Sequence, residues 1–64
     1  MCDTNAYVIE GDVETLLLES LTLIRPEGGK VYLRNLFGEE RSFEGVISEV
    51  SFAKNKVLLI RQAG

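Results

Sequence analysis

The sequence of 64 residues contains no histidine, no tryptophan, one cysteine and one proline. Without histidine, the chain has no imidazole that could act as a general base near neutral pH or bind a metal ion. The single cysteine excludes a disulfide within the chain and is typical of a reducing compartment. A glycine-rich phosphate loop is also absent, and no basic residue adjoins Cys2 to favour its thiolate. These absences argue against an enzyme.

Long apolar runs and a strong positive charge are missing as well. No stretch approaches the roughly 18 consecutive apolar residues of a membrane-spanning helix, and no signal-peptide pattern is present. Seven Lys and Arg against ten Asp and Glu give a net charge of −3. Such a balance disfavours nucleic acid, whose affinity depends on displacing counterions with basic side chains. We therefore expect a cytoplasmic protein that binds neither nucleic acid nor membranes.

The length of the chain limits how stable one copy can be. Residues 1–64 are expected to form one domain, and a domain of this size buries only about 60% of the surface that its unfolded chain exposes. A disulfide cannot add stability here, so association of subunits, with a metal ion at their interface as a further contribution, is the expected supplement. We expect a homodimer.

Short apolar and β-branched runs alternate with turn residues along the whole sequence. Strands are predicted at 6–10, 13–19, 21–25, 31–36, 41–44, 46–52 and 57–60. The glycine-rich segment 26–30 predicts a hairpin, and Gly45 predicts a bulge or a corner. For 14–23, which contains three consecutive leucines, a two-turn helix remains an alternative.

Alternation along the predicted strands indicates which side chains face the core. In 31–36, Val31, Leu33 and Asn35 are expected on one side and Tyr32, Arg34 and Leu36 on the other. The run 57–60 is expected to be buried on both faces. A further apolar side is predicted for the following residues of 46–52: Val46, Ser48, Val50 and Phe52.

Six or seven short strands, with no long helix and with Gly38 and Gly45 at corner positions, predict an all-β fold. The expected architecture is a small antiparallel β-barrel of the SH3 or Sm kind, because closure of the barrel removes the sheet edges. All three phenylalanines, Phe37, Phe43 and Phe52, are expected in its core.

Cys2 is the candidate site residue. Removal of Met1 is expected before a small second residue, and it would leave Cys2 with a thiol and a free α-amine beside the Asp3 amide. These donors can converge on one metal ion, and the thiolate is a soft ligand. The alternative is that Cys2 is a small buried hydrophobe, although a terminal residue is less often buried than an internal one.

Three segments, Met1-Cys2, Asn5-Ala6-Tyr7 and Leu36-Phe37-Gly38-Glu39, resemble the CooT family of small nickel-binding proteins, and the resemblance runs over nearly the whole chain. It implies a homodimer of small β-barrels, similar to the HypC-type hydrogenase chaperones, with one Ni(II) bound between the subunits. It also implies a role in nickel supply to carbon monoxide dehydrogenase, so that this enzyme or its maturation proteins would be partners. Cys2 is then the metal ligand, and the Phe37-Gly38-Glu39 segment is a structural signature.

The donor chemistry agrees with this implication. Two copies of Cys2 on a twofold axis would supply two thiolates and at least two nitrogens, and a square-planar set of this kind suits Ni(II) or Cu(II). The carboxylate pairs at Glu10 with Asp12 and at Glu39 with Glu40 are expected to be surface charges, since neither offers the six or more oxygens of a calcium site. The alternative function is a small β-barrel interaction module that binds protein or RNA without metal.

Overall fold

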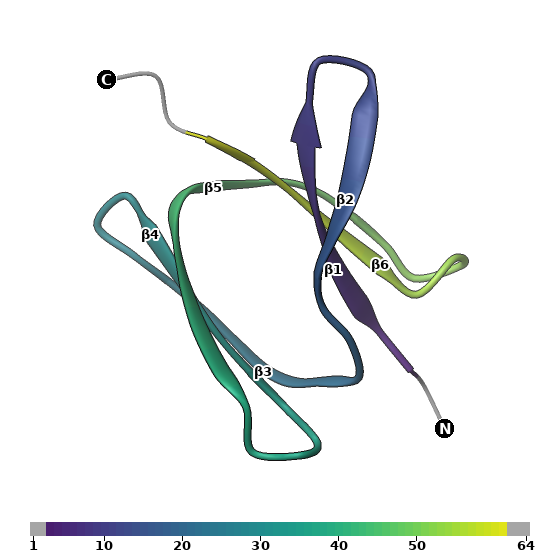
Figure 1. Cartoon of the computed structure of the whole chain (residues 1–64), viewed down its shortest axis with the longest axis vertical. Helices are drawn as coiled ribbons and strands as arrows, with labels where there is room; N and C mark the ends of the chain where they lie inside the picture. The colour runs from purple at the N-terminus through teal and green to yellow at the C-terminus, as the bar shows by residue number, and fades with distance from the viewer. Residues whose placement is uncertain (1–2, 62–64) are drawn as a thin grey trace.

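The computed structural model describes residues 3–61, and in this range the chain is all-β. The strands, in chain order, are β1 (Asn5–Glu10), β2 (Val13–Leu18), β3 (Leu21–Glu27), β4 (Lys30–Asn35), β5 (Glu40–Ser51) and β6 (Lys56–Arg61). They form one six-stranded sheet in the order β2-β1-β6-β5-β4-β3 (Figure 1). Between residues 3 and 61 there is no helix, and hence none that could cross a membrane.

The long strand β5 joins two halves of the sheet. Its residues 40–44 pair with β4, and its residues 45–51 pair with β6. Figure 1 shows β5 curving from the side of β3 and β4 to the side of β1 and β6. The change of partner occurs at Gly45, where a Cβ atom would collide with the carbonyl oxygen of Ile60 and lie 2.5 Å from Cε2 of Phe43. Gly45 is therefore the corner that the sequence predicted, because only a residue without a side chain allows this close approach.

The sheet is not closed into a barrel, so the prediction of a closed antiparallel barrel is wrong. In the part of the chain that the structure describes, β2 pairs only with β1 and β3 only with β4. The two residues between β2 and β3 carry the chain from one half of the sheet to the other instead of reversing it as a hairpin. The pairing is also mixed, since β1 and β6 run parallel.

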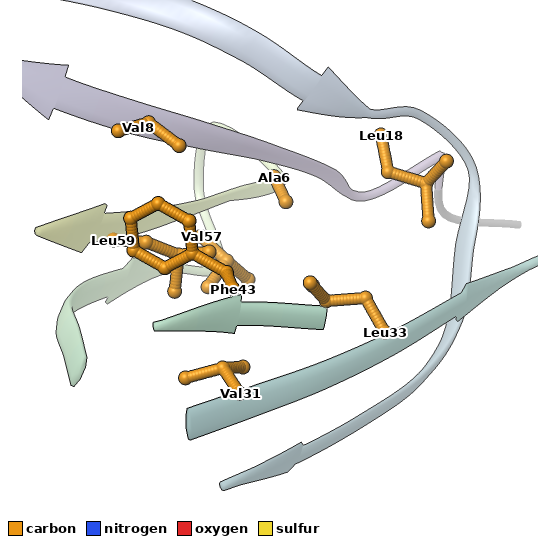
Figure 2. Close-up of a cluster of buried hydrophobic side chains, with 8 residues drawn as sticks. All are labelled: Ala6, Val8, Leu18, Val31, Leu33, Phe43, Val57 and Leu59. Carbon is orange, nitrogen blue, oxygen red and sulfur yellow. The ribbon is translucent and has the colours of Figure 1, made fainter. Parts of the chain in front are cut away.

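The hydrophobic core lies between the two halves of the sheet (Figure 2). It consists of the buried side chains of Ala6, Val8, Leu18, Val31, Leu33, Phe43, Val57 and Leu59. Of the three phenylalanines predicted in the core, only Phe43 is there. Phe37 is 70% exposed and Phe52 is 87% exposed, because both lie in turns beyond the strand ends.

The predicted hairpin and the alternation along its second arm are confirmed. β3 and β4 pair antiparallel, and Val31, Leu33 and Asn35 are buried, whereas Arg34 is exposed. The helical alternative for 14–23 is excluded, since residues 13–18 form β2 and pair with β1.

Two expectations about the later strands are corrected. β6 is buried on one face only, through Val57 and Leu59, while Ile60 on the other face is 37% exposed. In β5, Ile47 rather than the predicted Val46 packs against the core, from the position opposite Leu59, and a bulge between Ile47 and Glu49 then breaks the alternation. A bulge adds one residue to a strand and thereby shifts the faces of the side chains that follow it.

Candidate functional site

Cys2, the predicted metal ligand, lies outside the described residues, but the backbone that follows it is placed. Thr4 O accepts a hydrogen bond of 2.7 Å from Leu21 N, and Asn5 N donates one of 3.0 Å to Asn55 O. From Asn5 onward the chain forms β1, which lies between β2 and β6 inside the sheet. The chain is thus anchored two positions after Cys2.

The side chain of Asn5 connects this anchor to the turn after β2. Its Oδ1 accepts a hydrogen bond of 3.0 Å from Ser20 N. Ser20 has a positive φ of 57°, and its carbonyl oxygen accepts a bond of 2.8 Å from Leu36 N. Through Ser20, the second and the third of the sequence segments singled out above, at Asn5 and Leu36, are brought together although they lie 31 positions apart in the chain.

Asn35 organises the loop that contains the Phe37-Gly38-Glu39 segment. Its side chain is almost fully buried, at 2% exposed. Oδ1 accepts hydrogen bonds from Phe37 N at 3.1 Å and from Glu39 N at 2.8 Å, and Nδ2 donates one of 2.8 Å to Oε1 of Glu39. The loop therefore wraps around one amide group, which satisfies every polar atom of this buried side chain.

This arrangement explains the residue types of the segment. Gly38 has a φ of 83°, a conformation that other residues resist, and Glu39 supplies the carboxylate that Asn35 needs. Leu36 and Phe37 are 68% and 70% exposed, on a loop that the Asn35 side chain holds in place. The sequence placed Asn35 on the buried side of its strand but gave no sign of these bonds. The sequence signal for such a loop is a lone polar residue on an apolar strand face, here Asn35, with a glycine three positions later.

An apolar hollow lies beside the anchored N-terminal segment. Its volume is about 370 Å³, and Thr4 lines it together with residues of β3, β5 and β6. Among its apolar members are Leu21, Leu23, Val50 and Phe52. Val50 is 43% exposed and Phe52 is 87% exposed. A large apolar surface that stays in water marks an interaction site more often than a packing defect.

Three of the four carboxylates predicted to be surface charges are engaged individually, and the fourth, Asp12, is exposed. Glu10 binds Arg61 at 3.0 Å and Glu40 binds Arg34 at 3.3 Å, while Glu39 belongs to the Asn35 loop. Within residues 3–61, no three acidic side chains gather as a metal site. A third ion pair joins Lys56 Nζ to Glu14 Oε1 at 2.7 Å, and this hydrogen bond raises the pKa of Lys56.

Comparison with known proteins agrees with these features. The family model of the CO dehydrogenase accessory protein CooT matches residues 1–60. The chain belongs to the CooT family. Its fold is similar to the crystal structure of a candidate CooT from Carboxydothermus hydrogenoformans, with a TM-score of 0.88, 27% identity, and coverage of 97% of this chain and 100% of the other. The uncharacterized protein MJ1551 of Methanocaldococcus jannaschii is 30% identical over 59 residues, which are 92% of this chain and 96% of that protein.

Membership in the CooT family gives a context to the cluster around Ser20. The match includes Cys2, the anchor at Thr4 and Asn5, and the Asn35 loop. Hydrogen bonds of Thr4 and Asn5 hold the backbone that follows Cys2. The apolar hollow that Thr4 lines exposes Val50 and Phe52. The arrangement can present a short N-terminal segment from a rigid support.

Proposed function

We propose that this chain is a nickel-binding accessory protein of carbon monoxide dehydrogenase, in which two copies share one Ni(II) through Cys2. The metal is cargo, and the protein supports its supply to the enzyme or to its maturation proteins without catalysing a reaction. Membership in a family of CO dehydrogenase accessory proteins supports the client. The metal and its site are inferred from the chemistry of the chain.

The donor set supports nickel through the groups that one terminal cysteine can offer. After removal of Met1, Cys2 would provide a thiolate, an amine and the adjacent amide of Asp3. One copy offers a single thiolate and cannot complete a shell of two sulphur and two nitrogen donors. Two copies provide two thiolates and at least two nitrogens. Amide or amine nitrogen combined with thiolate in a square plane suits Ni(II), while Zn(II) would prefer the same donors in a tetrahedron.

The anchoring of Thr4 and Asn5 supports a preorganised site. Metal ligands bind best when the backbone that carries them is held by a rigid element. Here the hydrogen bonds of Thr4 O and Asn5 N hold the chain two positions after Cys2. The chain from Thr4 onward is therefore held in place before the metal binds.

The apolar hollow beside Thr4 is the observation that carries the proposal of a shared site. A second copy seated on this surface would cover Phe52 and Val50, which are otherwise in water. Because Thr4 lines the same hollow, a twofold axis at this surface would direct the two N-terminal segments toward each other. The interface and the metal site would then be one structure.

Sedimentation equilibrium tests this surface. We expect the protein to be a dimer at micromolar concentration with and without nickel. The Phe52→Asp variant should be a monomer, since truncation of a central aromatic contact costs about 2 kcal/mol or more of association energy and a buried charge costs more. The matched control is Val13→Asp, which changes another exposed apolar side chain at the far end of β1 and β2 and should remain a dimer. A monomeric unmodified protein, or a dimeric Phe52→Asp variant, would contradict the proposed interface.

A further inference from the structure

The outer face of β3, β4 and the first part of β5 carries a second hollow. Val31 and Leu33 of β4 point into the core, so Tyr32 between them faces outward. Tyr32 is paired with Arg25 on one side and with Ser42 on the other. The hollow around it has a volume of about 410 Å³ and is also lined by Leu23, Lys30 and Arg34. This volume lies in the range of about 300–1,000 Å³ that is typical of small-molecule sites.

Basic side chains gather here although the chain as a whole is acidic. Arg25, Lys30 and Arg34 line the hollow with one carboxylate, that of Glu27, whereas the whole sequence has three more acidic than basic residues. Among the residues that line the hollow, cations outnumber carboxylates three to one, which favours an anion as the ligand.

The three cations differ in how far they are already engaged. Arg34 is held by Glu40 at 3.3 Å, and Tyr32 is the first cause that raises the pKa of Arg34, ahead of Glu40. Glu27 and Glu44 lie opposite Lys30 in the strand ladders, but neither Lys30 nor Arg25 forms an ion pair within residues 3–61.

We propose that this hollow binds a small phosphorylated molecule with a flat ring, of the size of a nucleoside monophosphate. The ring lies against Tyr32 and Leu23, since aromatic side chains bind flat rings by stacking at about 1–3 kcal/mol each. A phosphate monoester carries a charge of about −1.5 to −2 at pH 7, which the two positive charges of Arg25 and Lys30 match. The hydroxyl of Ser42 is available to donate a further hydrogen bond.

The basic hollow differs in its lining from the apolar hollow beside Thr4. Leu23 lines both hollows, but none of the basic residues or Tyr32 lines the one beside Thr4. A long single-stranded nucleic acid is a less suitable ligand, because the net charge of −3 opposes its repeated phosphates.

A titration of the full chain with AMP, followed by the amide signals in NMR spectra, tests the proposal. We expect saturable shifts in β3, β4 and near Ser42, with weaker binding of adenosine and of inorganic phosphate because each supplies half of the contacts. Arg25→Gln should weaken AMP binding about tenfold, as the loss of one charge-assisted contact predicts. Tyr32→Leu should weaken AMP and adenosine but leave the affinity for phosphate unchanged.

Lys54→Gln is the matched control, because it removes one exposed positive charge from the turn before β6 and not from the hollow. It should bind AMP as the unmodified protein does. Absence of saturable shifts at millimolar AMP, or equal losses in Arg25→Gln and Lys54→Gln, would overturn the site. Equal affinity for phosphate and AMP would overturn the role of the ring. Binding of a ten-nucleotide single strand that AMP does not displace would overturn the assignment to a small molecule.

Discussion

Replacement of Cys2 by serine is expected to abolish nickel binding and to leave the fold and the dimer intact. An ordinary thiol ionises at about pH 8.5, whereas a serine hydroxyl stays protonated at that pH. Serine therefore cannot replace the soft thiolate donor. Even the loss of a group that only supports a ligand costs about 10–100-fold in metal affinity, and loss of the sulphur ligand should cost more than about 100-fold. Isothermal calorimetry with Ni(II) measures this loss.

The same variant distinguishes the proposed ligand from a buried cysteine. If Cys2 were core filler, the serine hydroxyl would cost about 1 kcal/mol of stability or more and the nickel affinity would stay the same. The control is a chain extended by one residue before Cys2, which keeps the thiol but converts the amine into an amide. It should bind nickel more weakly and retain sulphur ligation. Full affinity in both variants would show that nickel binds elsewhere.

Substitution of Gly45 by alanine should give the largest loss of stability. The added Cβ would meet the carbonyl oxygen of Ile60, which is backbone and cannot move aside as a side chain would, and Cε2 of Phe43 at 2.5 Å. Overpacking of a core typically costs about 1–3 kcal/mol and occasionally more. A domain of this size has only about 3–5 kcal/mol from its core. We expect the urea midpoint to fall by roughly half or more, or the protein to be unfolded without denaturant.

Gly11→Ala is the matched control for this prediction. Gly11 has a φ of 62°, and nothing lies within 4 Å of an added Cβ. Alanine there is strained by the backbone alone, which costs about 1 kcal/mol. A loss of stability at Gly45 no greater than that at Gly11 would show that β5 can turn its corner without the close contact to Ile60.

Local patterns predicted the features that depend on neighbouring residues. The alternation of Val31, Leu33 and Asn35 toward the core follows from the period of a strand, and the hairpin follows from the glycines between β3 and β4. Gly45 was recognised as a corner because glycine interrupts an otherwise regular strand pattern. In each case the physical cause lies within a few positions of the residue concerned.

Features that depend on distant partners could not be read in this way. The parallel pairing of β1 with β6 and the open edges at β2 and β3 depend on long-range packing. Phe52 is apolar in sequence, but only the structure shows that no part of residues 3–61 covers it. The bulge after Ile47 shifts the later side chains of β5 by one position, and no residue there signals it.

The candidate site likewise has one part that the sequence predicts and one part that depends on distant contacts. Cys2 could be proposed from its position and from the donor chemistry of a terminal cysteine. The support behind it could not, because Asn5, Ser20 and Leu36 meet only through two hydrogen bonds between segments far apart in the chain. The role of Asn35 was missed for a related reason, since a buried amide and its partners are recognised from geometry and not from residue type.

The ratio of nickel to protein, combined with X-ray absorption of the bound metal, tests the central claim most directly. Two Cys2 residues that share one metal predict half an equivalent of Ni(II) per chain, with thiolate sulphur in the first coordination shell. Binding should strengthen as pH rises, because thiol, amine and amide must lose protons to coordinate. One Ni(II) per chain, or a shell of oxygen and nitrogen alone, would contradict a site shared through Cys2.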